Sequence, residues 1–223
     1  MQCKYCQHSC FKAGRQPNGK QKYFCNLCKK YQQSEYVYDA CKENQEAKII
    51  LLNNEGCGIR SIARILSISA TTVIKNIKAI ADKIISPALQ PHSDYETDEL
   101  KTFVQNKETE CWVAYAICKL TGKVEAFTIG RRTKENIEQV INTLLLNEAH
   151  SIATDGLNIY PQLIPSTIHR QGRNRTNKIE RMNLTLRTHL KRLNRKTICF
   201  SKTYAMLNAC LKIYCWQQEV NQL

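Results

Sequence analysis

Residues 155–202 read DGLNIYPQLIPSTIHRQGRNRTNKIERMNLTLRTHLKRLNRKTICFSK, and the interpretation of the whole chain depends on this stretch. Between Gly156 and Gln218 the chain carries one acidic residue, Glu180, among many arginines and lysines. A basic run of this density is typical of a solvated surface or of a binding site for a polyanion. The single carboxylate inside it therefore needs an explanation of its own.

The surroundings of Glu180 predict a helix. Residues 177–193 have apolar side chains at the spacing of an amphipathic helix, namely Ile179, Met182, Leu186, Leu190 and Leu193. A helix salt bridge would need a cation three or four residues from Glu180. The residues at those positions are uncharged: Thr176, Asn177, Asn183 and Leu184. Glu180 therefore either complements the positive end of the helix, or binds a metal ion while its basic surroundings hold nucleic-acid phosphates.

The composition points to an intracellular partner of negative charge. The chain has 223 residues, with 33 Lys and Arg against 19 Asp and Glu, and a formal net charge of +14. Such an excess favours nucleic acid as the partner. The sequence has no apolar stretch long enough to span a membrane, and its N-terminus does not read as a signal peptide. We therefore expect a cytoplasmic protein with no membrane partner, whose 12 cysteines are thiols or metal ligands rather than disulfides.

Two C-x-x-C pairs near the N-terminus have the spacing of a zinc site. The four cysteines are Cys3, Cys6, Cys25 and Cys28. Each pair makes a tight turn with both sulfurs facing one point, and two such turns give a closed, structural tetrahedral site. Residues 17–19, Pro-Asn-Gly, predict a turn between short strands. His8 and Cys10 are alternative ligands whose spacing fits less well. The sequence thus predicts a zinc ribbon over residues 1–35.

Residues 36–88 predict an all-α helix-turn-helix domain. A first helix is expected over residues 45–54, and residues 58–84 carry the pattern of the motif itself. Its packing positions hold small or apolar residues, namely Ile62, Ala63, Leu66, Ile68 and Val73. Ser67 stands where such motifs usually have glycine, and Ser69 is the expected N-cap of the second helix. A plain helical hairpin without a role on DNA is the alternative.

These two domains carry candidate DNA contacts. In the second helix of the motif, side chains that would face the major groove are Thr71, Thr72, Lys75 and Asn76. On the ribbon, side chains that would hold phosphates are Lys12, Arg15, Lys20 and Lys22. Ordinary surface charge explains the ribbon residues equally well.

The C-terminal part, residues 89–223, predicts an RNase H-like α/β domain entered through a linker at residues 86–97. Apolar runs over 97–105, 111–119 and 123–129 predict three antiparallel strands, with Thr121-Gly122 as the last hairpin turn. The expected elements that follow are a helix over 133–146, strands over 151–156 and 166–169, the helix over 177–193, and a last helix from Ser201. This order is typical of the RNase H-like fold.

In such a domain the central carboxylates come from the first strand, the fourth strand and a following helix. Here these positions are Asp98, Asp155 and Glu180. Glu96 and Glu99 compete with Asp98 for the first position. Three carboxylates can hold two divalent ions about 3.5–4 Å apart. Mg²⁺ suits an all-oxygen site that also binds substrate phosphate, with Mn²⁺ as an alternative ion.

The chain resembles the transposases of the insertion sequence 1 family over nearly its whole length. The blocks that carry the resemblance are TDELKTFV, FTIGRRT, ATDGLNIY and KIERMNLTLRTHLKRLNRKTICFSKT, of which the last is the most specific. The resemblance implies a catalytic triad of Asp98, Asp155 and Glu180, and it selects Asp98 over its acidic neighbours. One residue departs from the pattern, because the family often has tryptophan where this chain has Lys101.

The resemblance implies a prokaryotic, nucleoid-associated DNA transposase. It would bind the terminal inverted repeats of its element through the first 88 residues, cut at the ends, and join the freed 3′-hydroxyl to target DNA using two Mg²⁺. Side chains that would position DNA near the triad are Arg181, Asn183, Arg187, Lys191 and Arg192. A homodimer or larger assembly is expected because two ends must be cut together. The alternative is a non-enzymatic DNA-binding regulator, such as a repressor or a domesticated transposase.

The cysteine spacing generates a first testable prediction. Purified protein should carry one tightly held Zn²⁺, and Cys25→Ser should lose the metal and weaken DNA binding. The reason is that a ribbon of this size has almost no apolar core and unfolds without its metal. Elemental analysis of the purified protein measures the zinc. Folded protein that contains none would contradict the assignment.

Overall fold

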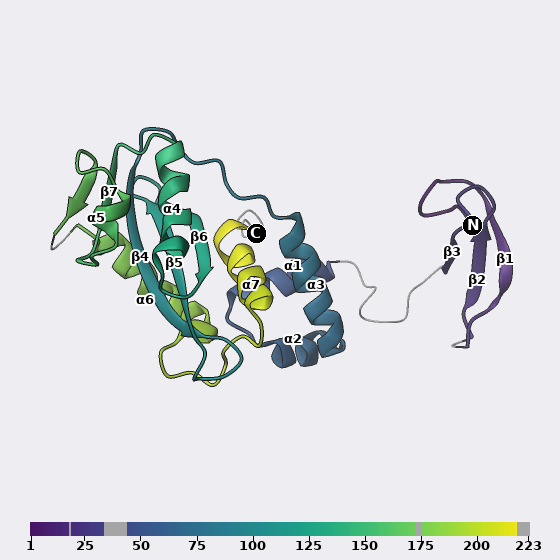
Figure 1. Ribbon diagram of the computed structural model, residues 1–223. Helices are drawn as coiled ribbons and strands as arrows, with labels where there is room; N and C mark the ends of the chain where they lie inside the picture. The colour runs from purple at the N-terminus through teal and green to yellow at the C-terminus, as the bar shows by residue number, and fades with distance from the viewer. Residues whose placement is uncertain (18, 34–43, 173–174, 218–223) are drawn as a thin grey trace.

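The computed structural model describes residues 1–17, 19–33, 44–172 and 175–217 (Figure 1). The expected boundary between residues 35 and 36, and Asn18 of the expected ribbon turn, lie outside the described residues. No helix in the described part of the chain is long and apolar enough to cross a membrane.

The N-terminal segment is a three-stranded antiparallel sheet in the order β1-β2-β3. Its strands are β1 (Cys10–Arg15), β2 (Gln21–Cys25) and β3 (Tyr31–Gln33). Phe11, Phe24 and Tyr31 lie opposite one another on successive strands, with ring centroids 5.7 Å and 4.7 Å apart. Cross-strand aromatic pairs stabilise a sheet, but this row is the main apolar contact of a very small unit. The segment therefore depends on a further source of stability.

Three helices follow: α1 (Gln45–Asn54), α2 (Ile59–Leu66) and α3 (Ala70–Lys83). The turn between α2 and α3 has Ser67 in the left-handed conformation, at φ 54° and ψ 38°, which explains why glycine is common at this position. Ser69 is the N-cap, as expected, and its Oγ accepts a hydrogen bond from Thr72 N at 3.0 Å. Ile62 and Val73 are fully buried at predicted packing positions. The predicted first helix is also confirmed.

A five-stranded mixed sheet forms the centre of the C-terminal part, in the order β6-β5-β4-β7-β8. Its strands are β4 (Asp94–Phe103), β5 (Glu110–Cys118), β6 (Val124–Gly130), β7 (Ser151–Thr154) and β8 (His169–Gln171). The first three strands pair antiparallel, and β7 and β8 continue the sheet in parallel from β4. This confirms the α/β element order predicted from the sequence.

Two predicted strand limits were wrong. The expected linker over residues 86–97 is too long, because β4 already begins at Asp94, which pairs with Ser151 of β7. The last strand begins at His169, where the sequence placed its end. Residues 166–168 instead form a turn, closed by a hydrogen bond of 3.0 Å from His169 N to Pro165 O.

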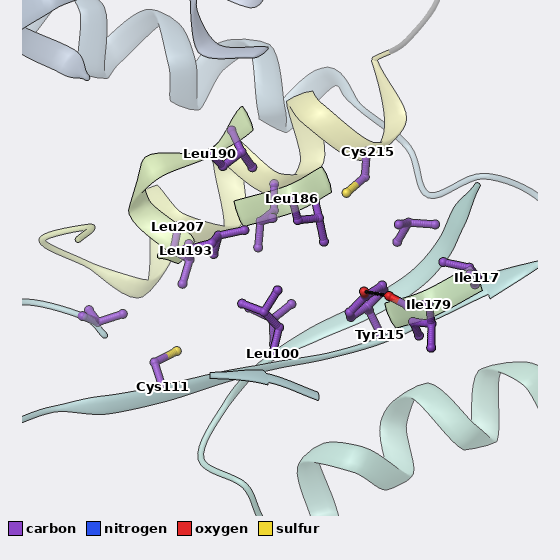
Figure 2. Packing of buried hydrophobic residues seen from close by; sticks show 14 residues of the cluster. Leu100, Cys111, Tyr115, Ile117, Ile179, Leu186, Leu190, Leu193, Leu207 and Cys215 are labelled. Carbon is purple, nitrogen blue, oxygen red and sulfur yellow. Dashed lines mark hydrogen bonds between the residues drawn. The ribbon is translucent and has the colours of Figure 1, made fainter. Parts of the chain in front are cut away.

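Helices cover both faces of the sheet. One face packs against α4 (Lys134–Leu146) and the short α5 (Tyr160–Leu163). The other face packs against α6 (Asn177–His189), the 3-10 turn η2 (Lys191–Leu193) and α7 (Tyr204–Trp216), as Figure 2 shows for the buried residues. The predicted helix over 177–193 therefore ends early. Leu190 leaves the helix at φ −106° and ψ 90°, and this lets both Leu190 and Leu193 reach the core.

Helix α7 is buried on two sides and lies between the sheet and the three N-terminal helices in Figure 1. Leu207 and Leu211 pack into the core of the sheet. Cys210 and Ile213 pack with α1, α2 and α3, and Asn53 Nδ2 of α1 donates to Cys210 O at 3.3 Å. The core of the three helices is thus completed by a helix from the far end of the chain, which a fragment ending at residue 88 would lack.

This shared helix generates a second prediction. Ile213→Ala should lower the free energy of unfolding by about 2–5 kcal/mol, because the side chain is completely buried. Hydrogen exchange should show reduced protection in α3 and in β6 together, since both pack on α7. Asn208→Ala, on the exposed side of the same helix, is the control and should change stability by less than about 0.5 kcal/mol. Lost protection confined to α1–α3 would contradict the shared core.

Candidate metal centre and active site

The four predicted cysteines converge at one point. Cys3 Sγ lies 3.5 Å from Cys28 Sγ, Cys6 Sγ lies 3.5 Å from Cys25 Sγ, and all four sulfurs are within 4.8 Å of one another. Zinc bonds of about 2.3 Å to tetrahedral thiolates place the sulfurs about 3.8 Å apart, so this donor set fits zinc. A zinc ion bound by these cysteines would supply the stability that the small sheet lacks.

Cys10 lies beside this cluster but outside it. Its Sγ accepts a hydrogen bond of 3.1 Å from Gln32 Nε2. Among the described residues, the sulfurs that lie within 4.8 Å of one another are those of the two C-x-x-C pairs, and Cys10 is not among them. The structure therefore agrees with leaving Cys10 out of the ligand set.

Three of the four acids of β4, at positions 96, 98 and 99, have different surroundings. Glu96 is buried, accepts a hydrogen bond of 2.8 Å from Ile179 N at the start of α6, and lies 4.0 Å from Lys119 Nζ. Glu99 points to the opposite face, where it accepts from Arg132 Nη2 at 2.8 Å and from the Tyr160 hydroxyl. Both carboxylates thus stabilise the fold. Asp98, between them, forms no ion pair with any residue that the structure describes.

Asp98 is half-buried and accepts two hydrogen bonds. Its Oδ1 accepts from Glu99 N at 2.7 Å, and its Oδ2 accepts from Asn183 Nδ2 at 2.6 Å. Burial raises the pKa of Asp98 to about 6, and the charges of Glu99 and Asp155 act in the same direction. The two hydrogen bonds oppose this effect only in part. An acid in this position favours a bound cation, because a cation would compensate for lost solvation and for like charge.

Asp155 follows the last residue of β7 and lies next to Asp98. The parallel register pairs Glu96 with Ala153, and continuing it by two places sets Asp155 beside Asp98. Asp155 is exposed, and its Oδ1 accepts a hydrogen bond of 3.0 Å from Leu157 N, which holds the turn after the strand. The two aspartates therefore share one end of the sheet.

Glu180 is exposed in the first turn of α6. Its Oε1 accepts a hydrogen bond of 3.1 Å from Thr176 Oγ1, and within the described part of the chain it pairs with no cation. Among the described residues, only the four cysteines bring three or more ligand atoms within 4.8 Å of one another. The structure thus sets Asp98 and Asp155 side by side, and Glu180 on the helix that faces them, without closing the three into one cluster.

The basic residues of α6 and η2 differ in what they contact. Arg181 and Lys191 are exposed, whereas Arg192 Nη1 donates to Ser201 Oγ at 2.8 Å. Arg187 is half-buried near Asp98, and burial together with the charge of Arg195 lowers its pKa. Asn183, predicted to contact DNA, is half-buried and is hydrogen-bonded to Tyr115 and Asp98.

A pocket of about 410 Å³ lies at the half of β4 that β7 does not cover. It is lined by Glu99, Lys101, Phe103, Trp112, Arg187 and Arg195. Lys101 lies directly opposite Trp112 of β5, and its Nζ is 5.8 Å from the ring centroid. A tryptophan is therefore present at this surface, although it comes from the neighbouring strand.

The remaining predicted DNA contacts are accessible to differing degrees. In α3, Thr71 and Lys75 are exposed, whereas Thr72 and Asn76 are half-buried. On the ribbon, exposed or half-buried basic side chains are Lys12, Arg15, Lys20 and Lys22. Lys22 Nζ lies 3.8 Å from the centroid of the Tyr31 ring.

A family model described as IS1 transposase matches residues 94–219. The chain belongs to the IS1 transposase family. The matched residues run from the start of β4 to beyond α7, so all three candidate carboxylates lie inside the region that defines the family.

Two curated relatives agree with this assignment. The insertion element iso-IS1n protein InsB of Shigella dysenteriae is 41% identical over 108 residues, which cover 48% of this chain and 82% of that protein. The insertion element IS1 9 protein InsB of Escherichia coli (strain K12) is 32% identical over 132 residues, or 57% of this chain and 79% of that protein.

Solved structures resemble the IS1-family chain more distantly. A chain of the simian T-cell lymphotropic virus intasome in complex with PP2A regulatory subunit B56 gamma has a TM-score of 0.40 and 16% identity, covering 73% of this chain and 66% of that one. The HTLV-2 integrase catalytic core domain in complex with magnesium (trimeric form) has a TM-score of 0.36 and 15% identity, covering 57% and 86%.

The raised pKa of Asp98 generates a third prediction. Well below pH 4 the carboxyl is protonated in both the folded and the unfolded chain. Well above pH 6 it is ionised in both, and the charge then costs the folded state on the order of 2–3 kcal/mol. Stability in metal-free buffer should therefore fall as the pH rises from 4 to 6. Asp98→Asn should lack this slope.

The Asp98→Asn protein should still be less stable at low pH, because its new amide meets the donors Glu99 N and Asn183 Nδ2. Urea denaturation of parent and variant at pH 4, 5, 6 and 7 measures the difference. Asp82→Asn, on the exposed surface of α3, controls for the loss of a carboxylate. Parallel pH profiles for parent and Asp98→Asn would rule out a raised pKa at Asp98.

Proposed function

We propose that this member of the IS1 transposase family binds the terminal inverted repeats of its element, cleaves the DNA at those ends, and transfers the freed 3′ ends into target DNA. The observation that carries the proposal is the placement of three carboxylates inside the family region. Asp98 lies within β4, Asp155 follows β7 beside it, and Glu180 begins the helix across from them.

The proposed catalytic cofactor is a pair of Mg²⁺ ions held by Asp98, Asp155 and Glu180, with Mn²⁺ as a substitute. All three donors are oxygen atoms, which suits these ions, and the repulsion between Asp98 and Asp155 is what a divalent cation would relieve. When bound, the two metals would activate the attacking oxygen and stabilise the leaving oxygen of a phosphodiester. Asp98 has a lone pair free on each oxygen after its two hydrogen bonds.

DNA recognition is proposed to involve the N-terminal segments. A structural Zn²⁺ on the four cysteines would hold the ribbon of residues 1–35. Within residues 36–88, α3 would enter the major groove with Thr71, Thr72, Lys75 and Asn76. The ribbon side chains that would bind phosphates are Lys12, Arg15, Lys20 and Lys22. The catalytic domain would comprise residues 89–223, although α7 contributes to the core of the helices before it.

DNA close to the carboxylates would lie against Arg181, Arg187 and Lys191. The exposed cations compensate for phosphate charge, and Arg187 faces the Asp98 side of α6. We propose a homodimer or larger assembly, because two element ends must be processed together. Its place of action would be the nucleoid in the cytoplasm of a prokaryotic cell.

The fourth prediction tests catalysis. Asp98→Asn, Asp155→Asn and Glu180→Gln should each reduce strand cleavage and joining by several orders of magnitude, because a displaced metal removes both activation and charge stabilisation. Binding of terminal DNA by the full-length variants should stay close to that of the parent. Gel-based assays with end-containing duplexes, in Mg²⁺ and in Mn²⁺, measure cleavage and joining from the product bands and DNA binding from the shifted bands.

Glu135→Gln is the matched control for Glu180→Gln. Glu135 is exposed in the first turn of α4, as Glu180 is in the first turn of α6. A charge that only complements a helix end contributes about 0.3–1 kcal/mol to stability and nothing to chemistry. If both variants transpose at near-parental frequency, Glu180 is such a charge and the triad is refuted. Parental protein that binds ends but never cuts would instead favour a regulator.

A further inference from the structure

Three side chains from three different elements form a continuous hydrogen-bonded chain at the candidate active site. The Tyr115 hydroxyl of β5 donates to Asn183 Oδ1 of α6 at 2.9 Å, and Asn183 Nδ2 donates to Asp98 Oδ2 of β4 at 2.6 Å. Tyr115 is 1% exposed, and its hydroxyl also lies 3.2 Å from Ile179 O. Figure 2 shows the tyrosine pointing at the first turn of α6.

The chemistry of the three groups fixes the orientation of the amide. An ionised carboxylate only accepts hydrogen bonds, so the nitrogen of Asn183 has to face Asp98. Its oxygen then faces Tyr115, whose hydroxyl carries the single proton that can be donated. The opposite orientation would place two oxygen atoms 2.6 Å apart at Asp98. The amide nitrogen and the amide oxygen of Asn183 therefore each have one specific partner inside the protein.

The same bond sets the position of α6 on the sheet. Ile179 and Asn183 are four residues apart and lie on one face of the helix, and both bond to β4, through Glu96 and Asp98 respectively. Glu180 lies between these two contacts in the sequence. The hydrogen bond that orients one candidate metal ligand thus also holds the helix that carries another.

We propose that Asn183 is a positioning residue for the Asp98 carboxylate, supported by Tyr115, and is not a contact to DNA. The inference rests on the proposed function of the Asp98 site. With Glu99 N on one oxygen and Asn183 Nδ2 on the other, the carboxylate is held in one orientation with a lone pair on each oxygen directed elsewhere. Groups that orient a ligand in this way commonly change metal affinity or activity by about 10–100-fold when removed.

The experiment compares full-length Asn183→Ala, Tyr115→Phe and Asp98→Asn with the parent. Mn²⁺ binding without DNA is measured by electron paramagnetic resonance. Terminal DNA binding is measured in buffer without Mg²⁺ or Mn²⁺ and without a chelator, which would remove the structural zinc. Cleavage is measured as a function of Mn²⁺ concentration. Thr188→Ala, on the exposed side of α6, is the control and should match the parent in all three assays.

Asn183→Ala should weaken Mn²⁺ binding by about 10–100-fold, and raised Mn²⁺ should recover most of the lost cleavage rate. Tyr115→Phe should act in the same direction with a smaller effect, because it keeps the amide but removes its fixed donor. DNA binding without Mg²⁺ or Mn²⁺ should change less than about twofold, since the carboxylate site is not needed for it. Asn183→Gln, which keeps the amide on a longer side chain, should recover part of the affinity.

The possible outcomes distinguish failure of this inference from failure of the proposed function on which it rests. If Asp98→Asn loses Mn²⁺ affinity while Asn183→Ala and Tyr115→Phe keep it, the positioning role is wrong and the metal site stands. If Asn183→Ala instead weakens DNA binding without Mg²⁺ or Mn²⁺ and keeps parental Mn²⁺ affinity, Asn183 is a DNA contact. If Asp98→Asn itself binds Mn²⁺ like the parent, the proposed site fails and the positioning role fails with it. Should Asn183→Ala not fold, Tyr115→Phe alone decides, and parental Mn²⁺ affinity in that variant overturns the inference.

Discussion

The burial of α7 on two opposite sides is the constraint on which the rest of the structure depends. One side contributes Leu207 and Leu211 to the core above the sheet, and the other contributes Cys210 and Ile213 to the core of α1–α3. Neither core is complete without this helix. A small helical unit buries too little apolar surface to be stable alone, so sharing a helix with a larger domain is a physical solution. The consequence is that α3 is held at a fixed position relative to β4.

The strand β4 shows how alternation assigns different tasks to neighbouring acids. Glu96 and Asp98 point to the face of α6, and Glu99 points to the face of α4 and α5. Two of these acids form hydrogen bonds or ion pairs that secure helices and loops to the sheet, and burial without such partners would be costly. Of these three acids, Asp98 alone is half-buried, lies near the carboxylate of Asp155 and forms no ion pair with a described residue. The candidate metal site at Asp98 thus differs from its neighbours because Glu96 and Glu99 already have partners inside the protein.

Much of this could be predicted from the sequence, because the relevant signals are local. The cysteine spacing, the cap at Ser69 and the order of strands and helices each follow from residues close together in the chain. The ends of helices and strands that depend on tertiary packing could not be predicted. Nothing in the helical period shows that Leu190 leaves α6, or that Asp94 starts a strand, because both depend on partners far away in the sequence. The basic run around Asn183 predicts a DNA contact, but it gives no sign of the hydrogen bonds that Asn183 makes to β4 and β5. The signal that could have found it is the buried hydroxyl of Tyr115 in an apolar strand, since such a group needs a hydrogen-bond partner.

Helix α6 contacts β4 at its start and the loop between α1 and α2 at its end. Its N-terminal turn carries Glu180 and bonds to β4, and its C-terminal carbonyl, His189 O, lies against Gly56 in the loop between α1 and α2. A Cβ on Gly56 would lie 2.1 Å from that oxygen, and the residue has φ +72°, so both space and conformation require glycine there. His189 Nδ1 also lies 2.6 Å from the Tyr214 hydroxyl of α7. The helix that presents a candidate catalytic carboxylate is therefore in contact with the segment proposed to read DNA, and any displacement of α1–α3 on binding would act directly on the end of α6.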